Sequence, residues 1–127
     1  MVSSRVPNAS GRLSNGQCRS KSGSALCHRI TDWSADFHDF SDTAALIENL
    51  DLVIAVDTAV AHLAGALGKP LWLLNRYNTC WRWLLDRDDS PWYPTARLFR
   101  QDETRRWDSV IASVQTALSD YVRDRVW

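Results

Sequence analysis

The chain has 127 residues, of which 45% are hydrophobic, and its 15 basic side chains balance 15 acidic ones. This length allows one small domain, and the apolar fraction excludes a wholly disordered protein. No apolar run approaches the roughly 20 residues that span a bilayer, so we expect no transmembrane segment. Cys18, Cys27 and Cys80 are too few for a disulfide scaffold and lack zinc-site spacing, so we expect free thiols.

The charge is unevenly distributed along the chain. Residues 1–31 carry five basic side chains and no acid, which leaves a net charge of minus five for residues 32–127. The first segment is also rich in Ser, Gly and Asn, and its sparse apolar residues cannot offset the entropy of ordering it. We therefore predict a flexible, disordered basic tail over residues 1–29 and one folded domain over residues 30–127.

The tail leaves several roles open. Its Arg- and Ser-rich, acid-free composition is compatible with a targeting peptide, whereas the lack of a continuous apolar stretch argues against a secretory signal. Five spread charges are weak support for a nucleic-acid-binding arm. We expect an unstructured leader on a cytoplasmic protein that does not bind nucleic acid.

The folded part begins with a short helix and a buried strand. Ser41 and Asp42 are suited to cap the helix. Residues 52–56, Leu-Val-Ile-Ala-Val, form a continuous β-branched apolar run, which is typical of a strand buried on both faces in a parallel sheet. A small-residue helix over residues 59–67 follows, and Gly68 and Pro70 end it.

The remaining elements continue the same α/β pattern. Residues 71–74 predict a second buried strand, and residues 97–99 a short third one. Apolar residues at helical spacing predict a final helix, with Asp108 near its start and Arg123 and Arg125 near its end, as the helix dipole favours. The expected fold class is α/β, a partial Rossmann-like parallel sheet.

The most informative stretch lies where the first strand ends and the next helix starts. In open α/β sheets, ligands bind at the carboxyl ends of strands. The first turn of a helix offers unpaired N–H groups and partial positive charge, so this point favours a phosphate or diphosphate. Small side chains at Ala59 and Ala61 let a ligand approach, and Thr58 adds a hydroxyl. His62 lies one turn in, and Asp57 suits a sugar hydroxyl.

A purely structural interpretation of the same residues stays open. Thr58 is then only an N-cap, Asp57 a turn former and His62 a half-buried histidine. A metal site at Asp57 and His62 is disfavoured because two ligands do not complete a coordination sphere.

Other candidates are weaker. Residues 86–89, Asp-Arg-Asp-Asp, resemble an Asp-x-Asp metal motif but occupy a polar turn. The clustered tryptophans could stack on a base or sugar, yet the alternation of Trp81, Trp83 and Leu85 favours packing in the core or at an interface. His38 sits among acidic residues and is expected at the surface.

Residues 57–70, Asp-Thr-Ala-Val-Ala-His-Leu-Ala-Gly-Ala-Leu-Gly-Lys-Pro, resemble the donor-site motif of glycosyltransferase family 9, the heptosyltransferase family. This form of the motif is similar to the one in the C-terminal part of bacterial tetratricopeptide-repeat glycosyltransferase-like proteins. The resemblance runs from about Ile30 to Leu118, and further separated blocks agree with it in order, at residues 39–47, 81–85, 90–94 and 98–101.

This resemblance implies a GT-B glycosyltransferase, in which two Rossmann-like halves enclose the active site and the C-terminal half holds the nucleotide-sugar donor. It implies donor diphosphate contacts through backbone amides and the Thr hydroxyl, at Asp57, Thr58, Ala59, Val60 and His62. Many heptosyltransferases have Gly where this chain has Ala59. No metal and no other cofactor is implied, since the nucleotide sugar is a substrate.

The resemblance also implies what lies outside this chain. The half that supplies acceptor contacts and the catalytic base, the repeats, and the first strands of the donor half have no counterpart here. We therefore expect the donor-binding portion of a glycosyltransferase that is inactive alone, with a homo-oligomer or a partner supplying the missing half. The alternative is a non-catalytic α/β interaction module or a truncated gene product.

Overall fold

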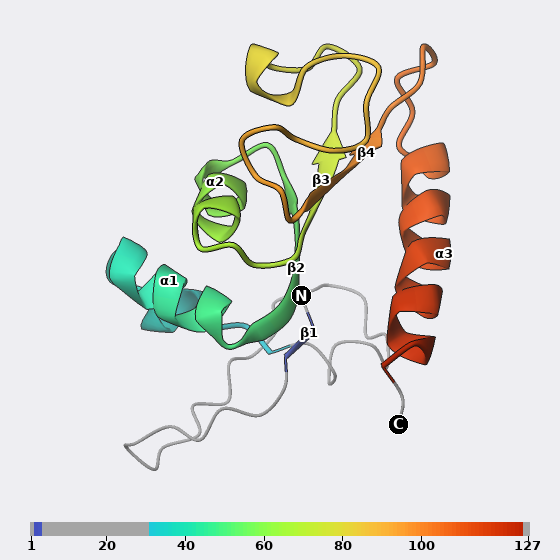
Figure 1. Ribbon diagram of the computed structural model, residues 1–127. Coiled ribbons are helices and arrows are strands. Elements are labelled where there is room, and N and C mark those ends of the chain that lie inside the picture. The colour runs from blue at the N-terminus through green and yellow to red at the C-terminus, as the bar shows by residue number, and fades with distance from the viewer. Residues whose placement is uncertain (1, 4–30, 126–127) are drawn as a thin grey trace, which may run out of the picture.

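The computed structural model describes residues 2–3 and 31–125. Apart from residues 2–3, the predicted basic tail lies outside the described residues, and so do Cys18 and Cys27. Figure 1 shows the elements in chain order: β1 (Val2–Ser3), η2 (Ser34–Asp36), α1 (Phe40–Glu48), β2 (Leu50–Val56), α2 (Ala59–Ala66), β3 (Leu71–Asn75), η3 (Trp81–Trp83), β4 (Ala96–Arg100) and α3 (Asp108–Arg123).

The central feature is a sheet in which β2, β3 and β4 run parallel, with β3 in the middle. Successive side chains of a strand point to opposite faces. Leu71 and Leu73 accordingly join the core on one face, while Trp72 joins the core on the other. A strand that is apolar at every position is therefore buried on both faces, as the sequence predicted.

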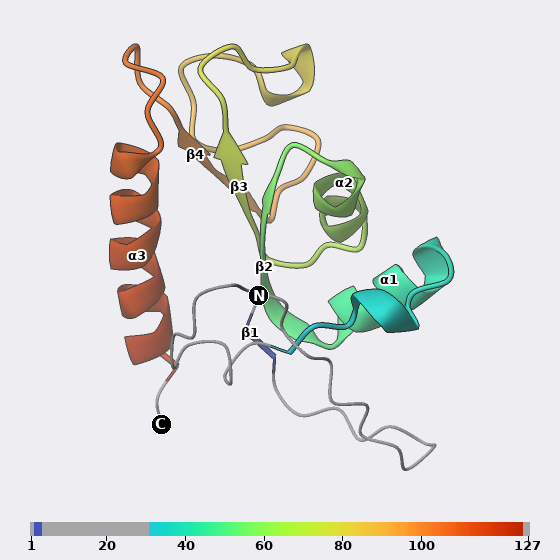
Figure 2. The ribbon, with the colours of Figure 1, turned by 180° about the vertical axis from the view of Figure 1, so that it is seen from behind.

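Helices cover the two faces of this sheet separately. Figures 1 and 2 show α1 and α2 on one side and α3 on the other. Ile47 of α1 and Ala61 and Ala64 of α2 pack into the first core. Val110 and Val114 of α3 pack into the second. The result confirms the predicted α/β class with a partial Rossmann-like parallel sheet.

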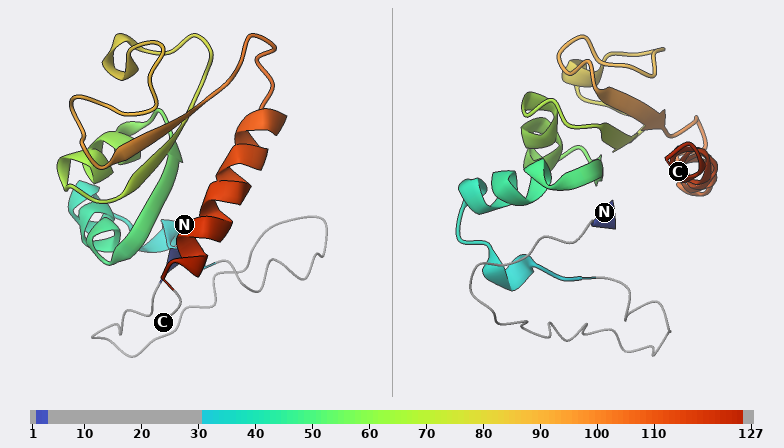
Figure 3. Two further views of the ribbon diagram at one scale, coloured as in Figure 1. Left: turned by 45° about the vertical axis from the view of Figure 1, so that its right-hand side comes forward. Right: turned by 60° about the horizontal axis from the view of Figure 1, so that its bottom comes forward.

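All three parallel strands end at the same edge of the sheet. Val56 pairs with Leu74, and Asn75 pairs with Arg100. The turn into α2, the excursion from residue 76 to residue 95 and the loop into α3 therefore leave from one side of the molecule (Figure 3). This side holds the stretch that the sequence singles out as a ligand site.

A fourth strand was not expected. β1 pairs antiparallel with the outer edge of β2, with Val2 opposite Leu52 and Ser3 opposite Leu50. The sequence of this two-residue strand has no pattern to predict it, and it falls within the predicted tail. An edge strand presents unpaired N–H and C=O groups, which favour pairing with any extended segment that reaches them.

The ends of the first two helices follow local chemistry. Asp39, and not Ser41 or Asp42 as predicted, is the N-cap of α1, because its carboxylate accepts from the N–H groups of both residues. α2 ends before Gly68, whose φ of 68° lies in the left-handed region that favours glycine. The Lys69 N–H then donates to the carbonyl of Ala64.

None of the described helices is long and apolar enough to cross a membrane.

The two-faced core makes a direct prediction about stability. Leu73 is fully buried in β3, whereas 69% of Leu85 is exposed. We expect Leu73→Ala to lower the free energy of unfolding by about 2–5 kcal/mol through lost burial and a residual cavity. Leu85→Ala serves as the matched control and should change it by less than about 0.5 kcal/mol. Urea denaturation measures both, and equal effects would contradict the assignment of the core.

Candidate functional site

The predicted site residues lie where β2 meets α2. Asp57 and Thr58 connect the two elements, and Ala59, Val60 and His62 belong to the start of α2. Thr58 has extended backbone and is the N-cap residue of α2, but its side chain caps no N–H group. Its hydroxyl donates instead to the carbonyl of Val56 at 3.2 Å. Within residues 31–125, neither the Ala59 nor the Val60 N–H group has a hydrogen-bond acceptor. The first turn of α2 thus presents free donors at the carboxyl end of the sheet.

Asp57 and His62 come together across this turn. Nε2 of His62 lies 3.4 Å from Oδ1 of Asp57, and the two side chains are 31% and 26% exposed. The acidic and imidazole groups therefore face each other at the surface of the site.

Two aromatic rings hold the imidazole from the other sides. The Tyr93 hydroxyl lies 3.1 Å from Nδ1 of His62. The Trp83 indole stacks on the imidazole, with ring centroids 5.2 Å apart and planes inclined by 21°. Tyr93 and Trp83 also contact each other, so the three rings form a closed cluster.

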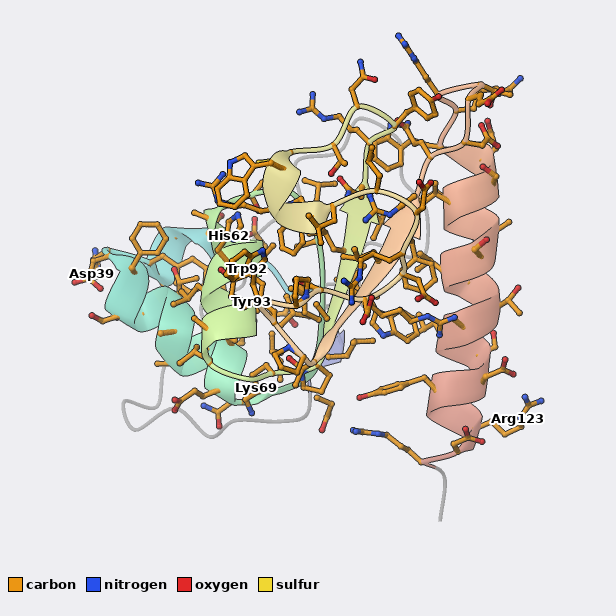
Figure 4. All side chains as sticks on the ribbon, turned by 45° about the horizontal axis from the view of Figure 1, so that its top comes forward. Asp39, His62, Lys69, Trp92, Tyr93 and Arg123 are labelled. Atoms are coloured by element: carbon orange, nitrogen blue, oxygen red, sulfur yellow. The ribbon has the colours of Figure 1, made fainter. Side chains whose placement is uncertain are left out.

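The ring of Tyr93 rests directly on α2. A Cβ atom added at Gly65 would lie 2.5 Å from Cγ of Tyr93, which no real packing permits. Gly65 lies three residues after His62 on the same face of α2. In Figure 4, His62, Trp92 and Tyr93 lie together over α2, while Lys69 lies toward the other end of that helix.

Sequence reasoning missed the groups that anchor the loop above the site. The Arg100 guanidinium of β4 donates to the carbonyls of Trp83 and Arg87. Asn75, at the end of β3, is buried and exchanges hydrogen bonds with Thr79. A polar residue that ends a buried strand is the available signal, but its partner depends on the loop conformation.

Of the residues predicted to pack in the core or at an interface, one lies in the core and the others are exposed. Trp83 is fully buried, but Trp81 is 66% exposed and Leu85 69% exposed. Residues 81–83 form a 3₁₀ helix and not a strand, so the alternation of two does not place these side chains on one face. Trp81 contacts the equally exposed Trp92 edge-on, at 6.3 Å between ring centroids.

The weaker candidates are explained by local contacts. Asp89 pairs with Arg87 at 2.5 Å, and within the described residues no three His, Cys, Asp or Glu side chains cluster as a metal site would require. The backbone N–H of His38 donates to Asp42, which places His38 beside the start of α1.

Cys80 lies beside the site and has an altered acidity. Hydrogen bonds from the Arg82 backbone and guanidinium lower the pKa of its thiol, and the nearby negative charge of Asp57 partly opposes this effect. Nη1 of Arg82 lies 3.2 Å from the sulfur. The thiol is free and half-buried.

Comparison with known proteins identifies the family of this chain. The model of glycosyltransferase family 9 (heptosyltransferase) matches residues 38–109, a range that contains the whole turn from Asp57 to His62. Protein FlbA of Caulobacter vibrioides (strain ATCC 19089 / CIP 103742 / CB 15) is 37% identical over 83 residues.

The aligned part covers 65% of this chain but 14% of FlbA, so the chain spans a small part of the length of that relative. No solved structure matches the chain significantly. The family match covers more than half of the chain and includes β2, α2, β3 and β4. The chain therefore belongs to glycosyltransferase family 9, the heptosyltransferase family, whose fold is GT-B.

Proposed function

We propose that this domain binds the nucleotide-sugar donor of a glycosyltransferase and holds the donor diphosphate at the first turn of α2. The observation that carries the proposal is the pair of free N–H groups at Ala59 and Val60, at the carboxyl end of β2. Unpaired N–H groups and the positive end of the helix dipole favour phosphate oxygens. Family membership supports glycosyl transfer as the reaction.

Each residue of the turn has a distinct role in this proposal. The N–H groups of Ala59 and Val60 donate to the phosphate oxygens, and the Thr58 hydroxyl turns from the Val56 carbonyl to add a third donor. The Asp57 carboxylate accepts from a hydroxyl of the ribose or sugar. His62 faces Asp57 at 3.4 Å and holds it in place.

The chemistry is direct displacement of the nucleotide by an acceptor hydroxyl. The C–O bond to the diphosphate breaks as the bond to the acceptor oxygen forms, so negative charge grows on the departing phosphate. Preorganised N–H donors that face this charge lower the barrier. We propose that the base that takes the acceptor proton, and the partner surface or second copy that presents the acceptor, lie outside this domain. No metal enters the mechanism.

One observation favours a second function. Trp81, Trp92 and Leu85 are large apolar side chains that lie exposed beside the site. Such groups mark protein contacts when they gather on one surface. The second candidate is accordingly a non-catalytic α/β module that associates with another protein or with itself.

Calorimetry with a panel of nucleoside monophosphates, diphosphates and nucleotide sugars tests the donor site. We expect a diphosphate to bind, and Thr58→Val to weaken its binding at least about tenfold, the cost of one lost charge-assisted hydrogen bond. His62→Ala should also weaken binding, because it releases Asp57. Thr116→Val, on the opposite face of the sheet, is the matched control and should not change the affinity.

Two results would contradict this proposal. The first is a Thr58→Val protein that binds as tightly as the wild type. The second is a folded protein that binds no member of the panel. A stable homodimer in sedimentation, together with absent binding, would support the interaction module.

The isolated chain should transfer little sugar. The proposed base lies elsewhere, so bound donor lacks an activated acceptor. Chromatographic detection of released nucleotide, with and without protein, measures this. Robust turnover of a nucleotide sugar by the purified chain would refute the separation of the two roles.

Cys80 offers a reporter that depends on pH. The thiolate is the reactive form, so a lowered pKa keeps Cys80 reactive at lower pH than a free thiol. In a protein with Cys18→Ser and Cys27→Ser, we expect Arg82→Ala to move the midpoint of iodoacetamide alkylation to higher pH. A bound diphosphate adds negative charge and should slow alkylation at fixed pH. Mass spectrometry follows both. An unmoved midpoint in Arg82→Ala would contradict a contribution from the guanidinium, since the backbone N–H donor remains in that variant.

A further inference from the structure

We propose that Tyr93 and Gly65 are positioning residues of the donor site, which fix the orientation of the His62 imidazole so that, in its neutral form, the proton lies on Nε2, facing Asp57. The inference rests on the proposed function for its effect on donor binding. Its structural part depends only on contacts within the protein. Neither residue belongs to the turn that the sequence singles out.

The two ring nitrogens of His62 face different partners. The negative charge of the Asp57 carboxylate, whose Oδ1 lies 3.4 Å from Nε2, favours a proton on Nε2. The other nitrogen of a neutral imidazole is an acceptor. The Tyr93 hydroxyl, 3.1 Å from Nδ1, is therefore the donor of that hydrogen bond. Together the two partners define both the tautomer and the direction of the ring.

Tyr93 is held in place by the contact of its ring with α2. Its ring lies so close to α2 that any side chain at Gly65 would overlap it, with the nearest ring carbons 2.5 and 2.7 Å from the added Cβ. Gly65 lies inside a regular helix, where glycine is a poor choice for its backbone. The close approach of the ring accounts for a glycine at this position.

Trp83 restrains the His62 imidazole from a third side. Trp83 is fully buried and stacks on the imidazole at 5.2 Å. The ring of His62 is thus confined between Trp83, the Tyr93 hydroxyl and the Asp57 carboxylate. Asp57 lies directly before the N-cap residue of α2, where we propose that the donor binds. If the imidazole is displaced, the Asp57 carboxylate loses the contact that fixes its position toward the donor.

Nitrogen NMR of the full chain with ¹⁵N-labelled histidine tests the structural part. The chain has three histidines, and His62→Gln identifies the signals of His62. At a pH where the spectrum shows the imidazole to be neutral, we expect Nδ1 of the wild type to be unprotonated and hydrogen-bonded. In Tyr93→Phe, which keeps the ring but removes the hydroxyl, the Nδ1 signal should move toward that of a free imidazole nitrogen.

Matched variants separate positioning from general damage. Tyr121→Phe removes a hydroxyl that donates to the Asp51 carbonyl, away from the site, and should leave the His62 signals unchanged. Gly65→Ala should disturb His62 as Tyr93→Phe does. In a Tyr93→Ala background, the added methyl group meets no ring, so Gly65→Ala should then have no further effect.

Two NMR results would overturn the inference. One is a proton on Nδ1 in the wild type, which would make Tyr93 an acceptor. The other is an Nδ1 signal that Tyr93→Phe leaves in place.

Donor binding tests the functional part. We expect Tyr93→Phe to raise the dissociation constant of the tightest-binding nucleoside diphosphate by roughly three- to tenfold, while its thermal midpoint stays near that of Tyr121→Phe. An unchanged dissociation constant together with a moved Nδ1 signal would overturn the role of Tyr93 in the donor site. If the wild type binds no nucleotide, the proposed function fails, and the NMR result alone decides whether Tyr93 and Gly65 position His62.

Discussion

The structure depends on the central strand β3, which is buried on both faces and paired on both edges. Leu71 and Leu73 contact the core under α1 and α2, and Trp72 contacts the core under α3. Such a strand needs a helix layer on each side and a neighbour on each edge. A parallel sheet with helical connections meets all of these needs, and it brings the carboxyl ends of β2, β3 and β4 to the same end of the sheet.

The candidate site at this end of the sheet is made by two segments that the fold brings together. The turn from β2 into α2 supplies the free N–H groups and the facing pair of Asp57 and His62. The long excursion between β3 and β4 supplies Trp83 and Tyr93, which enclose the imidazole. Arg100 ties this excursion to β4 by donating to two of its carbonyls, so the loop has a defined position.

This construction suits the proposed chemistry. Stabilising a departing phosphate requires donors that are already oriented before charge develops. The N–H groups of a helix start are oriented by the helix itself, and α2 is held by Ala61 and Ala64 in the core. The Asp57 carboxylate, which accepts a hydrogen bond from the donor in the proposed function, is held in place by its contact with His62. A domain that only binds and orients the donor needs no reactive base of its own.

The sequence predicted the regular elements well because their patterns are local. The apolar run of β2, the apolar run of β3 and the helical spacing of α3 each depend on neighbouring residues alone. Patterns that depend on loop conformation were predicted poorly. Trp81, Trp83 and Leu85 were expected to lie on one face, but residues 81–83 form a 3₁₀ helix and Leu84 has a positive φ, and only Trp83 is buried.

The α1 cap was placed two or three residues late, because Asp39, Ser41 and Asp42 are all suitable capping residues. Only the backbone geometry distinguishes them: Asp39 is extended and accepts from the other two. Competing local signals of equal strength therefore limit what a pattern can resolve, even where the helix itself is predicted correctly.

By itself, the sequence determined that residues 1–31 carry a net charge of plus five and residues 32–127 one of minus five, and that a strand meets a helix at Asp57 and Thr58. These features depend on composition and short-range spacing. Only the tertiary structure decided that Tyr93 bonds to His62, 31 residues away, and that its ring lies against Gly65. Contacts of this kind arise when the sheet and its loops pack, and no local pattern encodes them.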